Sequence, residues 1–268
     1  MPKIDLSNEN IVHIKKDGIE YLQFRKLLEY KNIQHCFTLA PLNFESNSSY
    51  ETKKEEVAEN YKKICKSLNL DYKNIIRPYQ THTANIEIVK DIFLEKPSIF
   101  SKEYKEIDGL ITNKTDKVLS LTYADCIPLY FFEPEKNVIA NIHSGWMGTT
   151  KKIGKIAVQK MIDEYECKAE KIICCIGPTI RKCHFEVEKD VKNIFENAFS
   201  YENIDKKQNN KYYIDAVEIN KKMLLEAGLK QENIIDSKIC TVCNCNKMYS
   251  YRGNAKTELR NTAIICLK

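Results

Sequence analysis

One cysteine and one histidine stand where apolar, strand-like runs of the sequence end. Cys126 follows the run Val118–Tyr123, and His143 follows Val138–Ile142. Between them Ile127–Phe132 is also strand-like and is followed by a polar turn, so we expect the two runs to lie side by side in one sheet. That arrangement would bring a thiol close to an imidazole.

A second histidine, His82, stands where another strand is predicted to begin, within the segment Asn74–Val89. Its sequence neighbours are small and polar, which suits an imidazole that faces a cleft. His13 and His35 have unremarkable surroundings, and we expect them to be structural.

His82, Cys126 and His143 together form a ligand set that catalytic zinc uses, with the fourth position kept for water. Zinc would lower the pKa of that water from ~16 toward ~7 and so supply hydroxide at neutral pH. The same residues could act without a metal, through a Cys126 thiolate that His143 activates for attack on an acyl or amide carbon. The residue types leave both readings open.

Two turns near these residues carry further polar groups. Asp108 precedes Gly109 in a tight turn that leads into a strand, which is common turn chemistry. Ser144 begins a glycine-containing turn that leads into a helix predicted over Thr149–Tyr165. Backbone N–H groups at a helix start can bind an anion, so phosphate is a natural candidate there.

A loop dense in ionisable groups, Ile180–Val187, precedes a helix predicted over Glu188–Phe199. Cys183 and His184 are potential metal ligands in this loop. Adjacent side chains of an extended chain point to opposite sides, so we do not expect both to serve one site. We favour Arg181 and Glu186 as the loop's contribution to the active site.

Near the C-terminus, Cys240, Cys243 and Cys245 resemble half of a zinc site. The second pair of ligands is missing from the pattern, so a structural zinc is not expected there. Arg252 follows two tyrosines and could clamp an anion, although stacking on a tyrosine at the surface is the simpler role for it.

Seven short motifs, in order along the chain, carry a family resemblance. They are Gln80-Thr81-His82, Asp108-Gly109, Thr122-Tyr123-Ala124-Asp125-Cys126-Ile127-Pro128, His143-Ser144-Gly145-Trp146, Ile176-Gly177-Pro178, Phe185-Glu186-Val187 and Ser250-Tyr251-Arg252. Together they resemble the laccase-domain family, also called the multicopper polyphenol oxidase or purine nucleoside phosphorylase family. The resemblance covers roughly positions 20 to 265.

This resemblance implies an α/β (α+β) fold, with one domain over residues 1–268 in which helices sandwich mixed β-sheets. The implied fold is similar to the cysteine-hydrolase-like fold of a bacterial deamidating toxin. The resemblance also implies zinc, sometimes reported as copper, on the residues that match the family's ligands, His82, Cys126 and His143. Its members are described as phosphorolysing adenosine, inosine and methylthioadenosine and as deaminating adenosine.

Specific roles follow as expectations. The expected catalytic residues are Cys126, His143, Asp108 and Glu186, and the expected substrate- or phosphate-binding residues are Gln80, Ser144, Arg181 and Arg252. The partners would be purine nucleosides and phosphate. Met147 stands where the family usually has a basic residue. If that residue holds phosphate in the family, then either Arg181, Arg252, Arg77 or Lys151 takes its place here or phosphorolysis is weak.

Two other activities compete with this reading. One is a Cys126–His143 amidase that edits peptidoglycan precursors, as described for some bacterial relatives. The other, least favoured, is a copper polyphenol oxidase. A multicopper oxidase needs about ten His, Cys or Met ligands, whereas this chain has five histidines and no His-x-His pair.

Composition excludes other classes. Of the 268 residues 43% are hydrophobic and 29% charged, and no apolar run approaches the ~20 residues that cross a bilayer. The net charge of +5 is scattered rather than collected into a basic face, which argues against nucleic-acid binding. Eleven cysteines and no secretion signal predict free thiols in the cytoplasm. We expect a monomer or weak homodimer.

Overall fold

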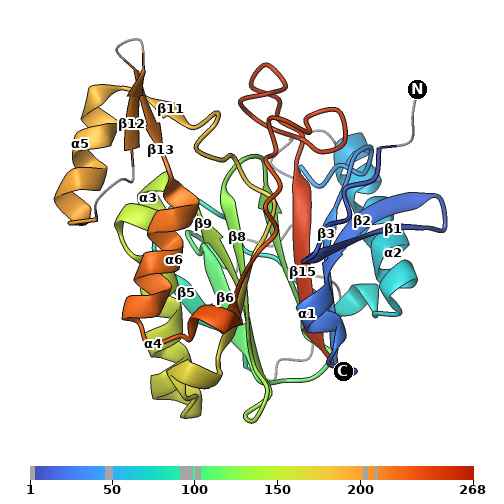
Figure 1. Cartoon of the computed structure of the whole chain (residues 1–268). Coiled ribbons are helices and arrows are strands. Elements are labelled where there is room, and N and C mark those ends of the chain that lie inside the picture. The colour runs from blue at the N-terminus through green and yellow to red at the C-terminus, as the bar shows by residue number, and fades with distance from the viewer. Residues whose placement is uncertain (1–3, 46–50, 91–98, 100–103, 202–204, 209–210) are drawn as a thin grey trace.

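The structure is a computed structural model that describes residues 4–45, 51–90, 99, 104–201, 205–208 and 211–268. Two six-stranded sheets form its centre (Figure 1). The first has the order β1-β2-β3-β15-β7-β4, with bounds Ile11–Lys16, Ile19–Phe24, Ile33–Thr38, Asn261–Leu267, Val118–Tyr123 and Ile75–Ile76. Its strands are antiparallel except at the β4–β7 edge.

The second sheet has the order β14-β10-β8-β9-β6-β5. Its bounds are Ile234–Asp236, Ile173–Ile176, Ile127–Glu133, Val138–Ser144, Gly109–Thr112 and Ile86–Ile88. Pairing is parallel at both edges, β14 with β10 and β5 with β6, and antiparallel between them. Strands β6, β8, β9, β10 and β15 are buried along their whole length, which explains their largely apolar composition.

The expectation that Val118–Tyr123 and Val138–Ile142 share a sheet is wrong. They are β7 of the first sheet and β9 of the second, and the two sheets pack face to face through one apolar core. The Tyr123 hydroxyl crosses this core to donate to the Ile142 carbonyl at 3.1 Å. The chain changes sheet just after β7, where Asp125 takes the left-handed backbone with φ of 88°. Cys126 therefore lies at the start of β8, whose first residue, Ile127, pairs with Ser144 at the end of β9.

Helices cover the outer faces of the two sheets (Figure 1). Helix α2 (Glu51–Leu68) packs on the first sheet through the apolar stripe that its sequence predicts. Helices α4 (Ile153–Tyr165) and α6 (Ala216–Glu226) pack on the second. The predicted α/β fold with mixed sheets sandwiched by helices is confirmed.

The remaining elements are short. They are α1 (Arg25–Leu28), α3 (Trp146–Thr150), α5 (Lys189–Ala198), 3₁₀ turns at 72–74, 169–171 and 231–233, and a small sheet of β11 (Glu186–Val187), β13 (Lys211–Ile214) and β12 (Asp205–Gln208). The small sheet and α5 lie together at the upper left of Figure 1. Among the described residues, no helix has the length and apolar character required to cross a bilayer.

The helix predicted over Thr149–Tyr165 is divided in two. Lys152 takes the left-handed backbone with φ of 62°, and it separates the five-residue α3 from α4. A helix of five residues has little macrodipole, so the anion site expected at this turn loses its electrostatic basis.

Candidate metal centre and active-site cavity

His82, Cys126 and His143 converge at one end of the two sheets, as their positions in the sequence predict. Cys126 Sγ lies 3.8 Å from His82 Nε2, and the two imidazole rings have their centroids 5.0 Å apart at an angle of 71°. One donor atom of each residue lies within 4.8 Å of the others. His82 stands in the loop between β4 and β5, with φ of 62°.

Asp108 fixes the orientation of both histidines. It is fully buried, and its Oδ1 accepts from His143 Nδ1 at 2.8 Å and from the backbone N–H of His82 at 3.1 Å. Its Oδ2 accepts from the N–H groups of Thr81 and Thr83 and from the Thr83 hydroxyl. The carboxylate thus gathers the His82 loop around itself and directs His143 Nε2 toward Cys126.

These contacts set the electrostatics of the site. Burial would raise the pKa of Asp108, but the hydrogen bonds from His143 and Thr83 hold it at about 2. Burial also opposes ionisation of Cys126 and His143, yet their mutual attraction lowers the pKa of Cys126 to about 6 and raises the pKa of His143 to about 9. Without a metal ion, both shifts favour the thiolate–imidazolium form of the pair.

Gly145 provides room for the three side chains. A Cβ at this position would lie 2.9 Å from His82 Cδ2 and 3.2 Å from Cys126 Sγ. A side chain here would press directly on two of the three candidate ligands. Their clustering therefore depends on a glycine in the turn that follows β9.

The three residues open onto a cavity of about 460 Å³, a size typical of small-molecule sites. Aromatic groups, two arginines and small polar groups line it: Gln80, His82, Thr122, Ala124, Asp125, Cys126, Ile127, His143, Ser144, Trp146, Thr149, Ile180, Phe185, Ala216, Tyr251, Arg252 and Arg260. The walls come from both sheets and from the loops before β11 and β15. A cavity with this lining can hold a planar ring together with an anionic group.

Gln80, Ser144 and Arg252 line this cavity, as the sequence analysis expected of substrate-binding residues. The amide of Gln80 is held at both ends by the backbone of Thr122. The Ser144 hydroxyl contacts Thr149 and Asn220. Of these three residues, Arg252 has the charge to meet an anion.

Three expected site residues do not line the cavity. Asp108 lies behind His143, and its hydrogen bonds make it a positioning residue. The Glu186 carboxylate accepts from the Tyr213 hydroxyl, and only its backbone carbonyl meets Arg252. Arg181 forms a two-pronged ion pair with Asp236 at 2.7 and 2.9 Å, which occupies its guanidinium.

Two charged residues of the cavity wall, Arg260 and Asp125, were given no role by the sequence analysis. The sequence around Arg260 contains no pattern that predicts a binding role, because the fold of the long loop before β15 is what brings Arg260 to the cavity. Asp125 accepts from the hydroxyls of Thr241 and Ser250 and from the backbone N–H of Arg252, at 2.5 to 2.6 Å. It ties this C-terminal loop to the strand end that carries Cys126. The only signal for it in the sequence is an aspartate between two strand-like runs, and aspartate is too common in turns for this to reveal its role.

The structure also corrects the expectation that Cys183 and His184 cannot share a site. Both lie beside Cys240 and Cys243 in a second cluster, with His184 Nδ1 3.7 Å from Cys240 Sγ and 3.6 Å from Cys243 Sγ. Residues 182–184 form a turn rather than an extended segment. In a turn of helical geometry, adjacent side chains diverge by about 100° instead of 180°.

The donor set of the first cluster fits a transition-metal ion. For tetrahedral zinc, bond lengths of ~2.3 Å to sulfur and ~2.0 Å to nitrogen place sulfur and nitrogen about 3.6 Å apart. The 3.8 Å between Cys126 Sγ and His82 Nε2 is close to this spacing. Asp108 on His143 Nδ1 is the carboxylate partner that a metal-bound histidine commonly has.

Comparison with known proteins places this geometry in a family. The sequence model of a family described as multi-copper polyphenol oxidoreductase laccase matches residues 38–268. The chain belongs to this family. Over 249 residues it is 30% identical to a purine nucleoside phosphorylase of Clostridium acetobutylicum, covering 90% of this chain and 95% of the relative. It is 27% identical over 194 residues to the adenosine deaminase RL5 of an unknown prokaryote, covering 70% and 73%.

A solved structure confirms the fold. YlmD from Geobacillus stearothermophilus superimposes with a TM-score of 0.87 and covers 96% of this chain and 99% of its own, at 23% sequence identity. The paired sheets and their helical covers are therefore a shared architecture of proteins whose sequences have diverged widely.

Proposed function

We propose that this protein is a metal-dependent purine nucleoside enzyme. It phosphorolyses adenosine, inosine and methylthioadenosine to the free base and (methylthio)ribose 1-phosphate, and it deaminates adenosine to inosine. The observation that carries the proposal is one cavity in which a His-Cys-His cluster faces aromatic side chains and two arginines. The activities that name the two relatives support this substrate class.

His82, Cys126 and His143 would hold the metal. Zinc suits one thiolate with two imidazoles, and copper is the second candidate. When bound, it would polarise a substrate oxygen or activate water.

The cavity offers complementary surfaces to the two halves of the substrates. Trp146, Phe185 and Tyr251 present apolar rings on which a purine can stack. Arg252 and Arg260 supply positive charge for phosphate. The Arg252 guanidinium donates to the carbonyls of His184 and Glu186 at 3.2 and 3.1 Å, which uses two of its five N–H donors.

Phosphorolysis fits this cavity better than deamination does. It requires an anion held against the anomeric carbon while an oxocarbenium-like sugar separates from the base, and arginine serves that role. Deamination requires a proton carrier that contacts the base. Neither Asp108 nor Glu186 lines the cavity, and the Asp125 carboxylate, which does, already accepts three hydrogen bonds.

Product analysis tests the proposal. Purified protein is incubated with each nucleoside, with and without phosphate, and we expect phosphate-dependent release of base and ribose 1-phosphate. Replacing Arg260 by Gln should raise the KM for phosphate about 10- to 100-fold, because a hydrogen bond to a charged group contributes about 1.5–3 kcal/mol. Lys151→Gln is the control, since this lysine is exposed and outside the cavity wall. Absence of both base and inosine from all three nucleosides would refute the proposal.

A specific observation favours a second candidate, a Cys-His amidase. Asp108, His143 and Cys126 are arranged as in thiol hydrolases, with the carboxylate on one ring nitrogen and the thiol near the other. Chelation separates the two candidates. Activity lost to a chelator and restored by zinc supports the metal-dependent enzyme, whereas chelator-resistant activity that a thiol alkylator blocks supports the amidase.

The histidines of this chain are too few and too scattered for the multicopper centre of a copper oxidase. Of the five histidines, His35 is buried and accepts from the Phe24 N–H, while His13 pairs with Glu20. The remaining three are divided between two separate clusters. A multicopper centre requires about ten ligands, several of them in His-x-His pairs.

A further inference from the structure

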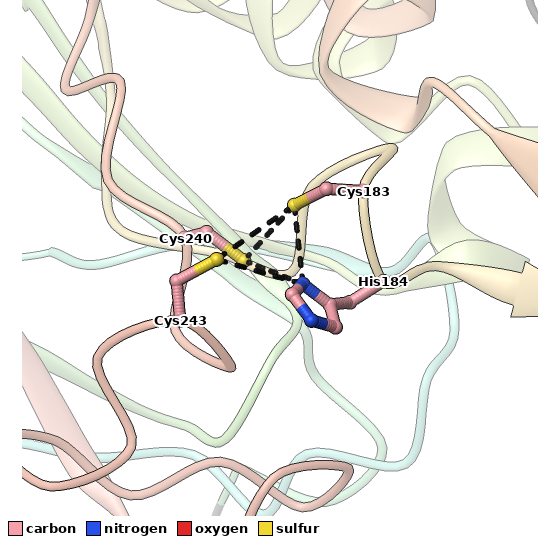
Figure 2. Close-up of side chains that lie close together, drawn as sticks. All are labelled: Cys183, His184, Cys240 and Cys243. Atoms are coloured by element: carbon pink, nitrogen blue, oxygen red, sulfur yellow. Dashed lines mark hydrogen bonds between the residues drawn. The ribbon is translucent and has the colours of Figure 1, made fainter.

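We propose that Cys183, His184, Cys240 and Cys243 form a second metal site, of the structural Cys3His type, which binds one zinc ion. Figure 2 shows the three sulfurs and the His184 ring directed toward a common centre. The four residues come from two loops that are 57 residues apart in the sequence between Cys183 and Cys240.

The distances within this cluster match a tetrahedral zinc site. Bond lengths of ~2.3 Å to sulfur and ~2.0 Å to nitrogen give edges of about 3.8 Å between sulfurs and about 3.6 Å between sulfur and nitrogen. Cys183 Sγ lies 3.6 Å from Cys240 Sγ and 3.9 Å from Cys243 Sγ. His184 Nδ1 lies 3.7 and 3.6 Å from those two sulfurs, and 3.1 Å from Cys183 Sγ. Four of these five edges fall within 0.2 Å of the ideal values.

Two local turns bring the ligands onto one side. The N–H groups of His184 and Phe185 both donate to the Arg181 carbonyl, which coils residues 182–184 so that adjacent Cys183 and His184 can converge. The Asn244 N–H donates to the Cys240 carbonyl at 3.2 Å. Side chains three residues apart in such a turn are neighbours, which pairs Cys240 with Cys243.

Cys245 is a natural internal control. It follows Cys240 by five residues in the same turn but is not a member of the cluster, and its Cβ lies against Gly253. It shares the loop and the residue type with Cys240 and Cys243, and its exposure lies between that of buried Cys240 and exposed Cys243. If loss of any thiol in this loop lowered the number of bound metal ions, replacing Cys245 would therefore lower it as well.

The proposed ion would join the two loops that frame the active-site cavity. One loop carries Ile180 and Phe185, and the other carries Tyr251 and Arg252. Arg252 already donates to the His184 carbonyl across the same junction. A closed four-ligand site leaves no position for water, so the role is to hold these walls in place rather than to perform chemistry.

Counting metal ions tests the proposal without any activity measurement. Protein prepared under reducing conditions with zinc should carry two ions per chain by native mass spectrometry. Cys183→Ser and Cys243→Ser should each carry one, and Cys126→Ser should also carry one because the second site is intact. The Cys245→Ser control should keep two.

If a ligand variant fails to fold, the second site can still be tested by loading the unaltered protein with cobalt and measuring its absorption spectrum. Three thiolates at the second site and one at the first should give strong thiolate-to-cobalt charge transfer, of which Cys126→Ser removes only the smaller part. One ion per chain that disappears in Cys126→Ser would overturn the proposal. A disulfide between Cys183 and either Cys240 or Cys243 in the reduced preparation would also overturn it.

Discussion

Replacing Asp108 by Asn tests whether one buried carboxylate organises the candidate metal centre of His82, Cys126 and His143. Asp108 accepts five hydrogen bonds, including those from His143 Nδ1 and the His82 N–H. An amide has one acceptor oxygen, so its NH2 group must face donors on one side. At least one buried N–H then loses its partner, and we expect the free energy of unfolding to fall by about 2–4 kcal/mol.

The larger consequence should fall on metal binding. Without a carboxylate at Nδ1, the His143 ring loses the partner that sets its tautomer and its direction toward Cys126. Loss of such a partner typically lowers metal affinity or activity about 10- to 100-fold. Zinc affinity is measured by competition with a chromophoric chelator, at a denaturant concentration where both proteins are fully folded.

Asp236→Asn is the matched control for this experiment. Asp236 is also buried and also engaged by several partners, Arg181 and Lys221 among them, but it lies outside the cavity wall. Both variants should lose stability, and only Asp108→Asn should lose zinc affinity at the first centre. Equal zinc affinity in Asp108→Asn and the unaltered protein would refute the positioning role that we assign to this carboxylate.

Three other predictions concern the centre, the core and the loop junction. Gly145→Ala should lower zinc affinity at the first centre, because its Cβ would lie 2.9 Å from His82 and 3.2 Å from Cys126; unchanged affinity by chelator competition would contradict this. Burial would raise the pKa of Asp236, but Arg181 and Lys221 hold that pKa at about 2, against an ordinary 3.8. The ion pairs of Asp236 therefore stabilise the fold above pH 4, and this stabilisation is lost as the pH falls toward 2. The stability gap between the unaltered protein and Asp236→Asn should therefore shrink by about 2 kcal/mol between pH 5 and pH 2 in urea unfolding; a constant gap would exclude this origin. Asp125→Ala should raise the KM for nucleosides and speed proteolysis within residues 240–254, since Thr241, Ser250 and Arg252 lose their common acceptor; an unchanged cleavage rate would show that the loop is held otherwise.

The helices and strands were largely predictable because their periodicity is local. The sequence predicts an amphipathic helix over Glu51–Leu68, because apolar residues recur at helical spacing from Val57 to Leu68, and helix α2 has these bounds. Strand β7 likewise has its predicted bounds, Val118–Tyr123. The polar composition of Ile204–Lys211 predicts a loop, since the segment has no apolar alternation. This prediction is wrong where the structure describes the segment, because Asp205–Gln208 (β12) and Lys211–Ile214 (β13) pair as strands.

By itself, the sequence determined which side chains could bind a metal, because residue type decides donor chemistry and strand ends are recognisable from composition. Tertiary structure decided which of them meet. The backbone turn at residues 182–184 places Cys183 and His184 together opposite Cys240 and Cys243, whereas extended-chain geometry predicted divergence. Whether these side chains come together depends on where two loops, distant in the sequence, are held. Asp125 holds one of these loops by accepting from Thr241 and Ser250, more than 100 residues away, and no local sequence pattern encodes that contact.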